Sequence, residues 1–388
     1  MRPLEQRSII SGIGISRIGR RLGFPGLDLT EESSRAAIED AGIAPVDIDA
    51  IATLGETPAA ELKAALGIAA PEIETGIDHG GLLSPLMSAC VAVSEGRARH
   101  VLVYRTVQML GGAMVPPSEP VDPSRSTPLE PMRTVGPMAG ASDLLANHAY
   151  SAANWLALHC QRHMHLYGTT KEQLGALAIN SRANAALNPL AAYREPISMN
   201  DYLSARPVSD PFGLLDCDVP IDGSIAMVVS TVDHEAGCDH PVRVQAMGGA
   251  TGRGGWYQRP DFPKMASVDA AQELWSRTDL KPADVDFAEL YDGFTFLTLA
   301  WLEALGFCGE GESGPFVEDA TRIALDGDLP LNTYGGQLSA GRMHGYWVVH
   351  EACLQLRGQA GDRQVVRHQL AAVAAGGGPI AGCLLLSR

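Results

Sequence analysis

The 388 residues are 46% hydrophobic and 19% charged, a balance typical of a globular chain with a large buried core. This composition excludes a disordered protein, and no Ser/Gly/Pro linker divides the sequence, so we expect one compact body. The net charge of −16 argues against a nucleic-acid surface, which needs clustered Lys and Arg.

In chain order, Ser8 to Ile18 has the apolar pattern of a buried strand. Thr30, followed by two glutamates, predicts the N-cap and acidic first turn of a helix that runs to about Asp40. Gly42 then ends this helix. A loop follows, and the apolar residues from Ile48 to Leu54 predict a short strand.

Residues from about 112 to 215 are rich in proline, with 11 of the 25, and have a helical middle, which predicts an insertion on the first half. Such excursions from a rigid core usually build the substrate pocket. The insertion contains His159, His163 and His165, and histidines at i, i+4 can bind zinc. No fourth ligand has convincing spacing, so we predict no metal site.

The second part of the sequence repeats the first. The Pro-x-Asp-x-Asp pattern of residues 45–49 recurs at residues 282–286, which lie 237 positions later. Two further pairs match in the same order: the apolar helical stretches 88–96 and 351–358, and the closing strands 222–230 and 377–387. Three ordered pairs predict two similar α/β halves, which we place at residues 1–240 and 241–388.

Cysteine usage and hydropathy indicate the compartment. The seven cysteines are scattered without a CxxC pair, which predicts reduced thiols in the cytoplasm. No apolar run approaches the roughly 20 residues that a membrane span needs. We therefore expect neither a membrane nor a nucleic acid among the partners.

The order of these segments resembles the thiolase superfamily, and within it the sterol-carrier-protein-x or lipid-transfer-protein branch. The resemblance covers nearly the whole chain and is carried by stretches such as YGTTKEQLGALAINSRANAALNP, DGSIAMVVS and LYDGFTFLTLAWLEALGFCGEGE. It implies the thiolase fold, with two α/β halves in α/β/α/β/α layers and a loop-domain insertion in the first half.

The thiolase nucleophile is missing from its expected place. Working thiolases attack the acyl group with a cysteine at the N-terminus of a buried helix. In the corresponding stretch DHGGLLSPLMSACVAV, His79 or Gly80 occupies that position. Cys90 lies about three turns further along, and we interpret it as a small buried hydrophobic residue.

The other thiolase motifs depart in the same direction. The Asn-Glu-Ala-Phe or His-Asp-Cys-Phe motif becomes YDGF with Tyr291 first, and GHPxG becomes GRMHGY, with Arg342 in place of the histidine. The C-terminal CxG motif becomes AAGGGP and has no cysteine. What remains resembles the steroid side-chain aldolases, which release a short acyl-CoA from a β-hydroxyacyl-CoA and leave a ketone.

A retro-aldol reaction needs a base for the β-hydroxyl proton and an acid that protonates the enolate carbon. Tyr291 and Tyr346 fit these roles, with Tyr346 provisionally the base, although the sequence does not order them. A phenol acting as base needs a nearby cation or hydrogen-bond donor, and Arg342 and His344 are candidates. Tyr334 in the nearby NTYGG loop competes with Tyr346.

The enolate oxygen needs fixed hydrogen-bond donors. Backbone N–H groups at Gly80 or at Gly377 and Gly378 are candidates, and His79 and Arg342 complete the set of predicted substrate or oxyanion residues. The GxG at residues 12–14 lacks the remaining dinucleotide-binding spacing, so we predict no nicotinamide and no cofactor beyond the CoA of the substrate.

The predicted activity is that of a carbon–carbon lyase acting on a steroid side-chain CoA thioester, with a 17-keto steroid and propionyl-CoA as typical products. Two alternatives stay open: an unusual thiolase or acyltransferase, and a non-catalytic subunit that binds a lipid or partner. The resemblance also implies a homodimer and a complex with a small partner that has an OB fold and a zinc-ribbon-like element.

Overall fold

The computed structural model describes residues 4–55, 57–73, 80–110, 141–251 and 255–388, without the side chains of residues 141 and 142. Eight strands form one sheet in the order β2-β3-β6-β1-β7-β10-β9-β8. Their bounds are β1 (Ser8–Ile15), β2 (Ala50–Thr53), β3 (His100–Gln108), β6 (Asp222–Thr231), β7 (Val242–Thr251), β8 (Phe287–Leu290), β9 (Leu370–Gly377) and β10 (Ile380–Ser387).

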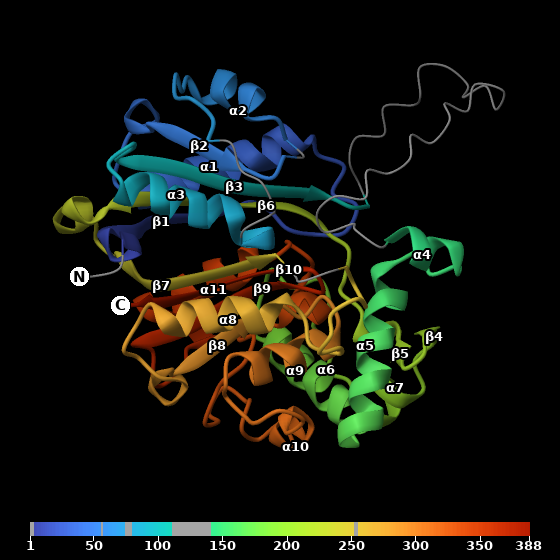
Figure 1. The fold of residues 1–388 in the computed structure, drawn as a ribbon. Helices are drawn as coiled ribbons and strands as arrows, with labels where there is room; N and C mark the ends of the chain where they lie inside the picture. The colour runs from blue at the N-terminus through green and yellow to red at the C-terminus, as the bar shows by residue number, and fades with distance from the viewer. Residues whose placement is uncertain (1–3, 56, 74–79, 111–140, 252–254) are drawn as a thin grey trace, which may run out of the picture.

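The strand order is symmetric about the contact between β1 and β7. The outer pairs, β2 with β3 and β8 with β9, are parallel, and the strands between them pair antiparallel. Two residue pairs, Ile9 with Arg243 and Ile10 with Val242, join β1 to β7. This join is short, and Figure 1 shows that the strands on its two sides form two stacked layers, which we call the first sheet (residues 8–231) and the second sheet (residues 242–387).

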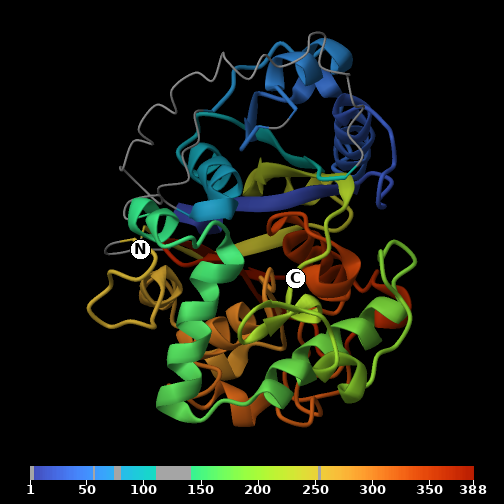
Figure 2. The same ribbon diagram turned by 90° about the vertical axis from the view of Figure 1, so that its right-hand side faces the viewer.

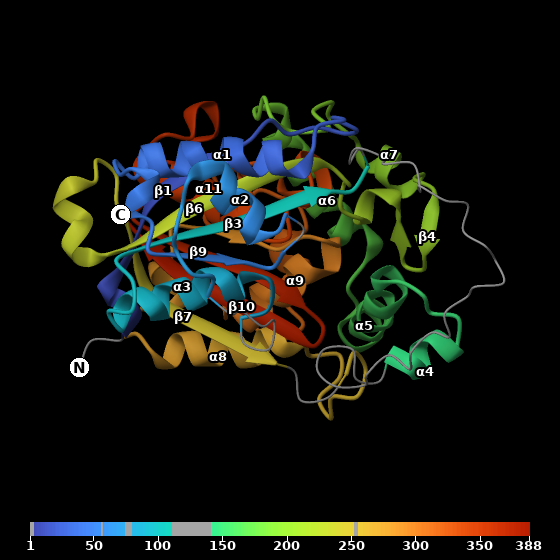
Figure 3. The same ribbon diagram turned by 90° about the horizontal axis from the view of Figure 1, so that it is seen from above.

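Helices cover both sheets and fill the space between them. They are α1 (Gly26–Asp40), α2 (Ala59–Leu66), α3 (Ser84–Ser94), α8 (Ala266–Ser276), α9 (Thr295–Ala304), α10 (Ser313–Val317) and α11 (Tyr346–Arg357). Helices α1 and α2 pack on the outer face of the first sheet, as Figure 3 shows from above, and α8 and α9 pack on the outer face of the second. Helices α3 and α11 lie between the sheets. The predicted α/β/α/β/α layers and two similar halves are confirmed; the division at residue 240 stays a prediction.

The core between the sheets contains Leu86 and Cys90 of α3 and Val349 and Cys353 of α11. Cys90 is fully buried, as predicted, and burial raises the pKa of its thiol to about 12. Within the described ranges, no helix is long and apolar enough to cross a membrane.

The described part of the insertion packs on the second half, although it belongs to the first half in sequence. Its elements are α4 (Ala141–Ala146), α5 (Ala152–Tyr167), α6 (Lys171–Ala186), α7 (Met199–Leu203), β4 (Pro207–Ser209) and β5 (Phe212–Gly213). Leu174 and Leu177 of α6 share a core with Trp301 of α9, and Figure 2 shows the green helices across the lower half. Buried Asp216 accepts a 2.7 Å hydrogen bond from Thr295 Oγ1, which ties the insertion to the start of α9.

The predicted start of the first helix is wrong. Helix α1 begins at Gly26, directly after Pro25, and Thr30 is a buried residue inside it. The Thr30 hydroxyl donates to Gly26 O (2.7 Å) and contacts Thr106 Oγ1 of β3. Thr30 is therefore a buried residue packed against β3 and not a helix cap. The local sequence contains no signal for this packing.

Candidate active site

The two inner helices begin beside each other at one end of the second sheet. A 3₁₀ turn, Gly81–Leu83, leads into α3, and Gly345 (φ 87°) precedes α11. A Cβ added to Gly345 would lie 2.5 Å from the Ala375 Cβ of β9 and 3.5 Å from Leu83 Cδ2, so only glycine fits there. The positive ends of two helix dipoles therefore meet at this point, which favours a developing negative charge.

Tyr291 follows β8 directly, and its N–H donates to Ala374 O of β9 (2.9 Å). Its ring packs against both the inner core and the core beneath the second sheet. Burial raises the pKa of the phenol, and the carboxylates of Asp218 and Asp292 raise it further, while Arg342 opposes them. Tyr291 therefore holds its proton tightly.

Tyr346 is the first residue of α11 and is fully buried. Its hydroxyl has no hydrogen-bond partner among the described residues. Burial raises the pKa of this phenol, and the cation of Arg105 acts against that rise. The hydroxyl is thus left for a ligand, beside a positive charge.

His344 lies in the loop before α11 with a left-handed backbone (φ 49°). Its Nδ1 is 2.8 Å from Nη2 of Arg105, which comes from β3 of the other sheet. Burial, Arg105 and Arg342 together lower the pKa of His344 to about 3. The imidazole is therefore neutral at physiological pH.

Arg342 binds Asp218, with its Nη1 3.2 Å from Asp218 Oδ2, and its backbone N–H donates to Val219 O (2.9 Å). Burial raises the pKa of Asp218 to about 6 despite this cation. The structure thus brings Arg342 close to both Tyr291 and His344, whose pKa values it lowers.

A π-helix, Gly336–Ala340, lies against Tyr291, and π-helical turns are frequent at functional sites. Buried Asp292 holds its start by accepting the Gln337 N–H (2.7 Å). The Gln337 side chain is 1% exposed, and neither of its polar atoms has a well-formed hydrogen bond within the described ranges. Its amide lies close enough to Tyr291 to lower the pKa of that phenol. An amide donor and acceptor is therefore available at the site.

The predicted oxyanion glycines fall in different places. Gly80 (φ 92°) packs against the backbones of β7 and β10, where a Cβ on Gly382 would lie 2.2 Å from Gly80 O. Gly377 ends β9 and pairs with Ile380. The N–H of Gly378 donates to the sulfur of Met265 (3.0 Å), on the α8 side of the sheet. This N–H is therefore already used in a hydrogen bond. His79 lies outside the described residues.

Tyr334 is also fully buried and stacks on Trp347 of α11 at 5.2 Å between ring centroids. Burial raises the pKa of this phenol well above its ordinary value, and Asp292, Glu289 and Glu351 raise it further. Its surroundings are acidic, which makes Tyr334 a poorer base than Tyr346.

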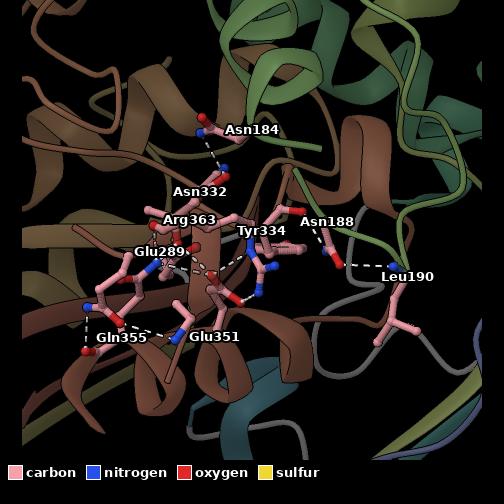
Figure 4. Close-up of polar contacts among 12 residues, drawn as sticks. Asn184, Asn188, Leu190, Glu289, Asn332, Tyr334, Glu351, Gln355 and Arg363 are labelled. Carbon is pink, nitrogen blue, oxygen red and sulfur yellow. Dashed lines mark hydrogen bonds and ion pairs between the residues drawn. The ribbon is translucent and has the colours of Figure 1, made fainter. Parts of the chain in front are cut away.

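Figure 4 shows the polar cluster that holds the loop from Asn332 to Tyr334. Asn332 Oδ1 accepts the N–H of Leu290, the residue before Tyr291 (2.7 Å). Thr333 Oγ1 lies between Glu289 Oε1 (2.7 Å) and Glu351 Oε1 (2.9 Å). Burial and the neighbouring Glu351 raise the pKa of Glu289 well above its ordinary value, which favours its protonated form.

Arg105, Asp218 and Gln337 are site residues that sequence reasoning missed. Arg105 carries a detectable signal, because it is the single Lys or Arg in the apolar strand HVLVYRTVQ. Asp218 and Gln337 have no such signal, since their neighbours come from distant parts of the chain.

The histidines of the insertion do not converge. Both ring nitrogens of His159 face backbone carbonyls, those of Pro263 and Trp256, and His163 Nε2 faces Glu303 Oε1 (2.9 Å). Across the part of the chain that the structure describes, no group of three or more His, Cys, Asp or Glu is arranged to hold a metal ion.

Comparisons with known proteins place this site in a family. Residues 248–384 match the "Thiolase C-terminal domain-like" family model. The chain is 31% identical to a steroid side-chain-cleaving aldolase of Thermomonospora curvata over 99% of each protein. It is 32% identical to the 17-hydroxy-3-oxo-4-pregnene-20-carboxyl-CoA lyase of Mycobacterium tuberculosis, covering 98% of this chain and 100% of that one. The solved structure of an Ltp2-ChsH2(DUF35) aldolase superimposes with a TM-score of 0.86 at 30% identity, over 99% of this chain and 98% of that chain. The protein therefore belongs to the thiolase superfamily, in the branch of the steroid side-chain-cleaving aldolases.

Proposed function

We propose that this protein is a carbon–carbon lyase that cleaves a β-hydroxyacyl-CoA with a steroid side chain by a retro-aldol reaction. The products are a ketone of the 17-keto steroid type and a short acyl-CoA such as propionyl-CoA. The names of the two full-length relatives support the substrate class.

In the proposed reaction Tyr346, as its phenolate, takes the proton of the β-hydroxyl. The Cα–Cβ bond breaks, the hydroxyl carbon becomes the ketone, and the electron pair of the bond passes to the thioester enolate. Tyr291 then donates its proton to Cα, and one proton passed from Tyr346 to Tyr291 restores the enzyme.

The unequal charge around the two phenols carries this assignment. Burial raises the pKa of both phenols, and the charges beside them differ. The cation of Arg105 acts against the rise at Tyr346 and so favours its phenolate. Asp218 and Asp292 add to the rise at Tyr291, where Arg342 opposes them. We base the roles of base and acid on these charged neighbours.

The thiols of the inner core count against a thiolase reaction. Cys90 and Cys353 are both fully buried, and burial raises the pKa of each to about 12. A reactive cysteine needs the opposite shift. We therefore expect no acyl-enzyme.

The proposal extends to assembly. The solved relative is an aldolase described as Ltp2-ChsH2(DUF35), which supports a complex of this chain with a small partner protein of that kind. We propose a homodimer of this chain that binds the OB-fold partner as a heterotetramer in the cytoplasm. Light scattering of the chain alone and with the partner tests this assembly; a fully active homodimer without the partner contradicts it.

The reaction is tested by supplying a β-hydroxy steroid acyl-CoA to the wild type, Tyr291→Phe and Tyr346→Phe, with the partner protein present. We expect ketone and short acyl-CoA from the wild type, and a loss of roughly 100-fold or more in turnover for each variant. Exposed Tyr150 provides the control, since Tyr150→Phe should keep wild-type turnover within about twofold.

Two results contradict the proposal. Wild-type turnover in both Tyr291→Phe and Tyr346→Phe removes the two-phenol mechanism. An acyl thioester on any cysteine, detected by mass spectrometry after trapping, would show that the protein is an acyltransferase and not a lyase.

A further inference from the structure

We propose that Arg105 is a positioning residue that locks His344 in one tautomer, so that its Nε2–H faces the oxygen of the enolate. The identity of that oxygen rests on the proposed function, whereas the tautomer does not.

The contact between Arg105 and His344 determines the tautomer. A guanidinium has only donors, so the 2.8 Å contact between Arg105 Nη2 and His344 Nδ1 requires Nδ1 to accept. A neutral imidazole carries one N–H, which must then be on Nε2. The structure thus selects one of two otherwise similar proton positions.

Both partners are held by their own backbones. Arg105 is 8% exposed, and its strand β3 is paired along its length with β6, where Arg105 stands opposite Ile225. His344 lies between Arg342, whose backbone is bonded to Val219 O, and Tyr346, the start of α11. The two sheets therefore set the distance between guanidinium and imidazole.

The Nε2 side of His344 is left for a ligand. No hydrogen bond joins Nε2 to any group in the described ranges, and the side chain is partly exposed. Burial, together with the cations of Arg105 and Arg342, keeps the ring neutral, so it offers a hydrogen bond without releasing a proton.

This geometry suits the enolate of the proposed reaction. Negative charge develops on the thioester oxygen as the carbon–carbon bond breaks, and a fixed N–H stabilises it most. The same ring in the other tautomer would present a lone pair to that oxygen and repel it. Arg105 itself does not touch the substrate in this proposal: it acts by orienting the proton of His344, besides the charge that it places near Tyr346.

Nitrogen-15 NMR of histidine-labelled protein measures the tautomer directly and needs no substrate. His344 is assigned by its loss in His344→Gln. We expect a single Nε2–H tautomer in the wild type, unchanged between pH 6 and pH 9, and a mixture with Nδ1–H in Arg105→Met. Arg105→Lys retains a donor and should retain the wild-type tautomer.

Turnover is then compared among the same proteins. We expect kcat to fall about 100-fold in Arg105→Met, a loss typical of one oxyanion donor, while KM changes little. Arg105→Lys should recover part of kcat. Arg357→Met removes another buried guanidinium, which pairs with Asp40, and should leave the His344 signal and kcat within about twofold of the wild type.

An Nδ1–H tautomer in the wild type overturns the inference, as does an unchanged tautomer in Arg105→Met. If Arg105→Met does not fold, the wild-type and Arg105→Lys spectra still decide. A wild type with the expected tautomer but no lyase activity would remove the proposed function and leave the arginine lock standing.

Discussion

At the scale of single residues, burial controls the ionisation of the site. Tyr291, Tyr334 and Tyr346 all have a raised pKa because water is removed from them, and the charged side chains beside each phenol differ. The residue type alone does not distinguish these three phenols. Their roles depend on which charged side chain lies next to each.

His350 of α11 predicts an acid-dependent loss of stability. Burial, Arg357 and Arg363 lower its pKa to about 3, whereas an unfolded histidine takes up a proton near pH 6.5. Between pH 6.5 and pH 3 the unfolded chain therefore binds a proton at this histidine that the folded chain does not bind. The free energy of unfolding consequently decreases as the pH is lowered. We expect His350→Gln to reduce this slope between pH 6 and pH 4 by about 1 kcal/mol per pH unit in urea titrations. Exposed His240, changed to Gln, should leave the slope unaltered.

Glu289 and Glu351 should respond differently to replacement by glutamine. The raised pKa of Glu289 favours its protonated form, so Glu289→Gln exchanges a neutral acid for a neutral amide and should cost no more than about 1 kcal/mol of unfolding free energy. Glu351 makes two contacts with buried Arg363 (3.1 and 2.9 Å), and Glu351→Gln leaves that cation without its partner, at a cost of about 3 kcal/mol. Urea unfolding measures both, and equal costs would contradict the protonated state of Glu289.

At the scale of elements, the start of α11 is the critical junction. The loop before it carries Arg342 and His344, and the helix begins with Tyr346. The packing of Gly345 against β9 fixes the position of Tyr346. A small shift of this helix moves three site residues together.

Two glycines at the ends of α11 provide a matched test. Gly345 and Gly358 both have positive φ (87° and 72°), but only Gly345 is closely packed. A Cβ on Gly345 would lie 2.5 Å from the Ala375 Cβ, whereas a Cβ on Gly358 would have its nearest contact at 3.9 Å. We expect Gly358→Ala to cost about 1 kcal/mol and keep activity, and Gly345→Ala to cost more than about 2 kcal/mol and to abolish turnover. Activity retained in Gly345→Ala would refute the importance of this junction.

At the scale of the whole molecule, the two halves are joined by side chains as well as by β1 and β7. Glu5 is 1% exposed and bonds Arg277 of the second half through both oxygens (2.6 and 2.8 Å), and Arg277 lowers the pKa of Glu5. Arg357 of α11 similarly reaches Asp40 of α1 (2.7 Å). These contacts favour unfolding of both halves as one cooperative unit.

A double-mutant cycle on Glu5 and Arg277 tests this joint. Arg277→Met leaves the buried Glu5 carboxylate without its partner and should lower the free energy of unfolding by about 3 kcal/mol. The double variant Glu5→Gln/Arg277→Met should lose less than the sum of the two single changes. Unfolding should remain a single transition by circular dichroism and tryptophan fluorescence. Two separate transitions in the wild type would show that the halves are independent.

The sequence by itself predicted the strands β1, β2, β6 and β10, the duplicated order and the loss of the thiolase cysteine, because periodicity and motifs can be read along the chain. It also singled out Tyr291 and Tyr346, through their places in the YDGF and GRMHGY motifs. The error at Thr30 arose where a locally good cap was buried against a strand 76 positions away. Local patterns carry no information about such distant neighbours.

Only the tertiary structure decided the electrostatics of the site. Arg105 and His344 are 239 positions apart, and Arg342 and Asp218 are 124 positions apart, so each pair meets only when the two sheets stack. Burial, which shifts the pKa of every phenol here, likewise exists only after the layers have closed. The sequence therefore determined which groups are present, and the packing of the two halves decided which of them are charged and where their protons lie.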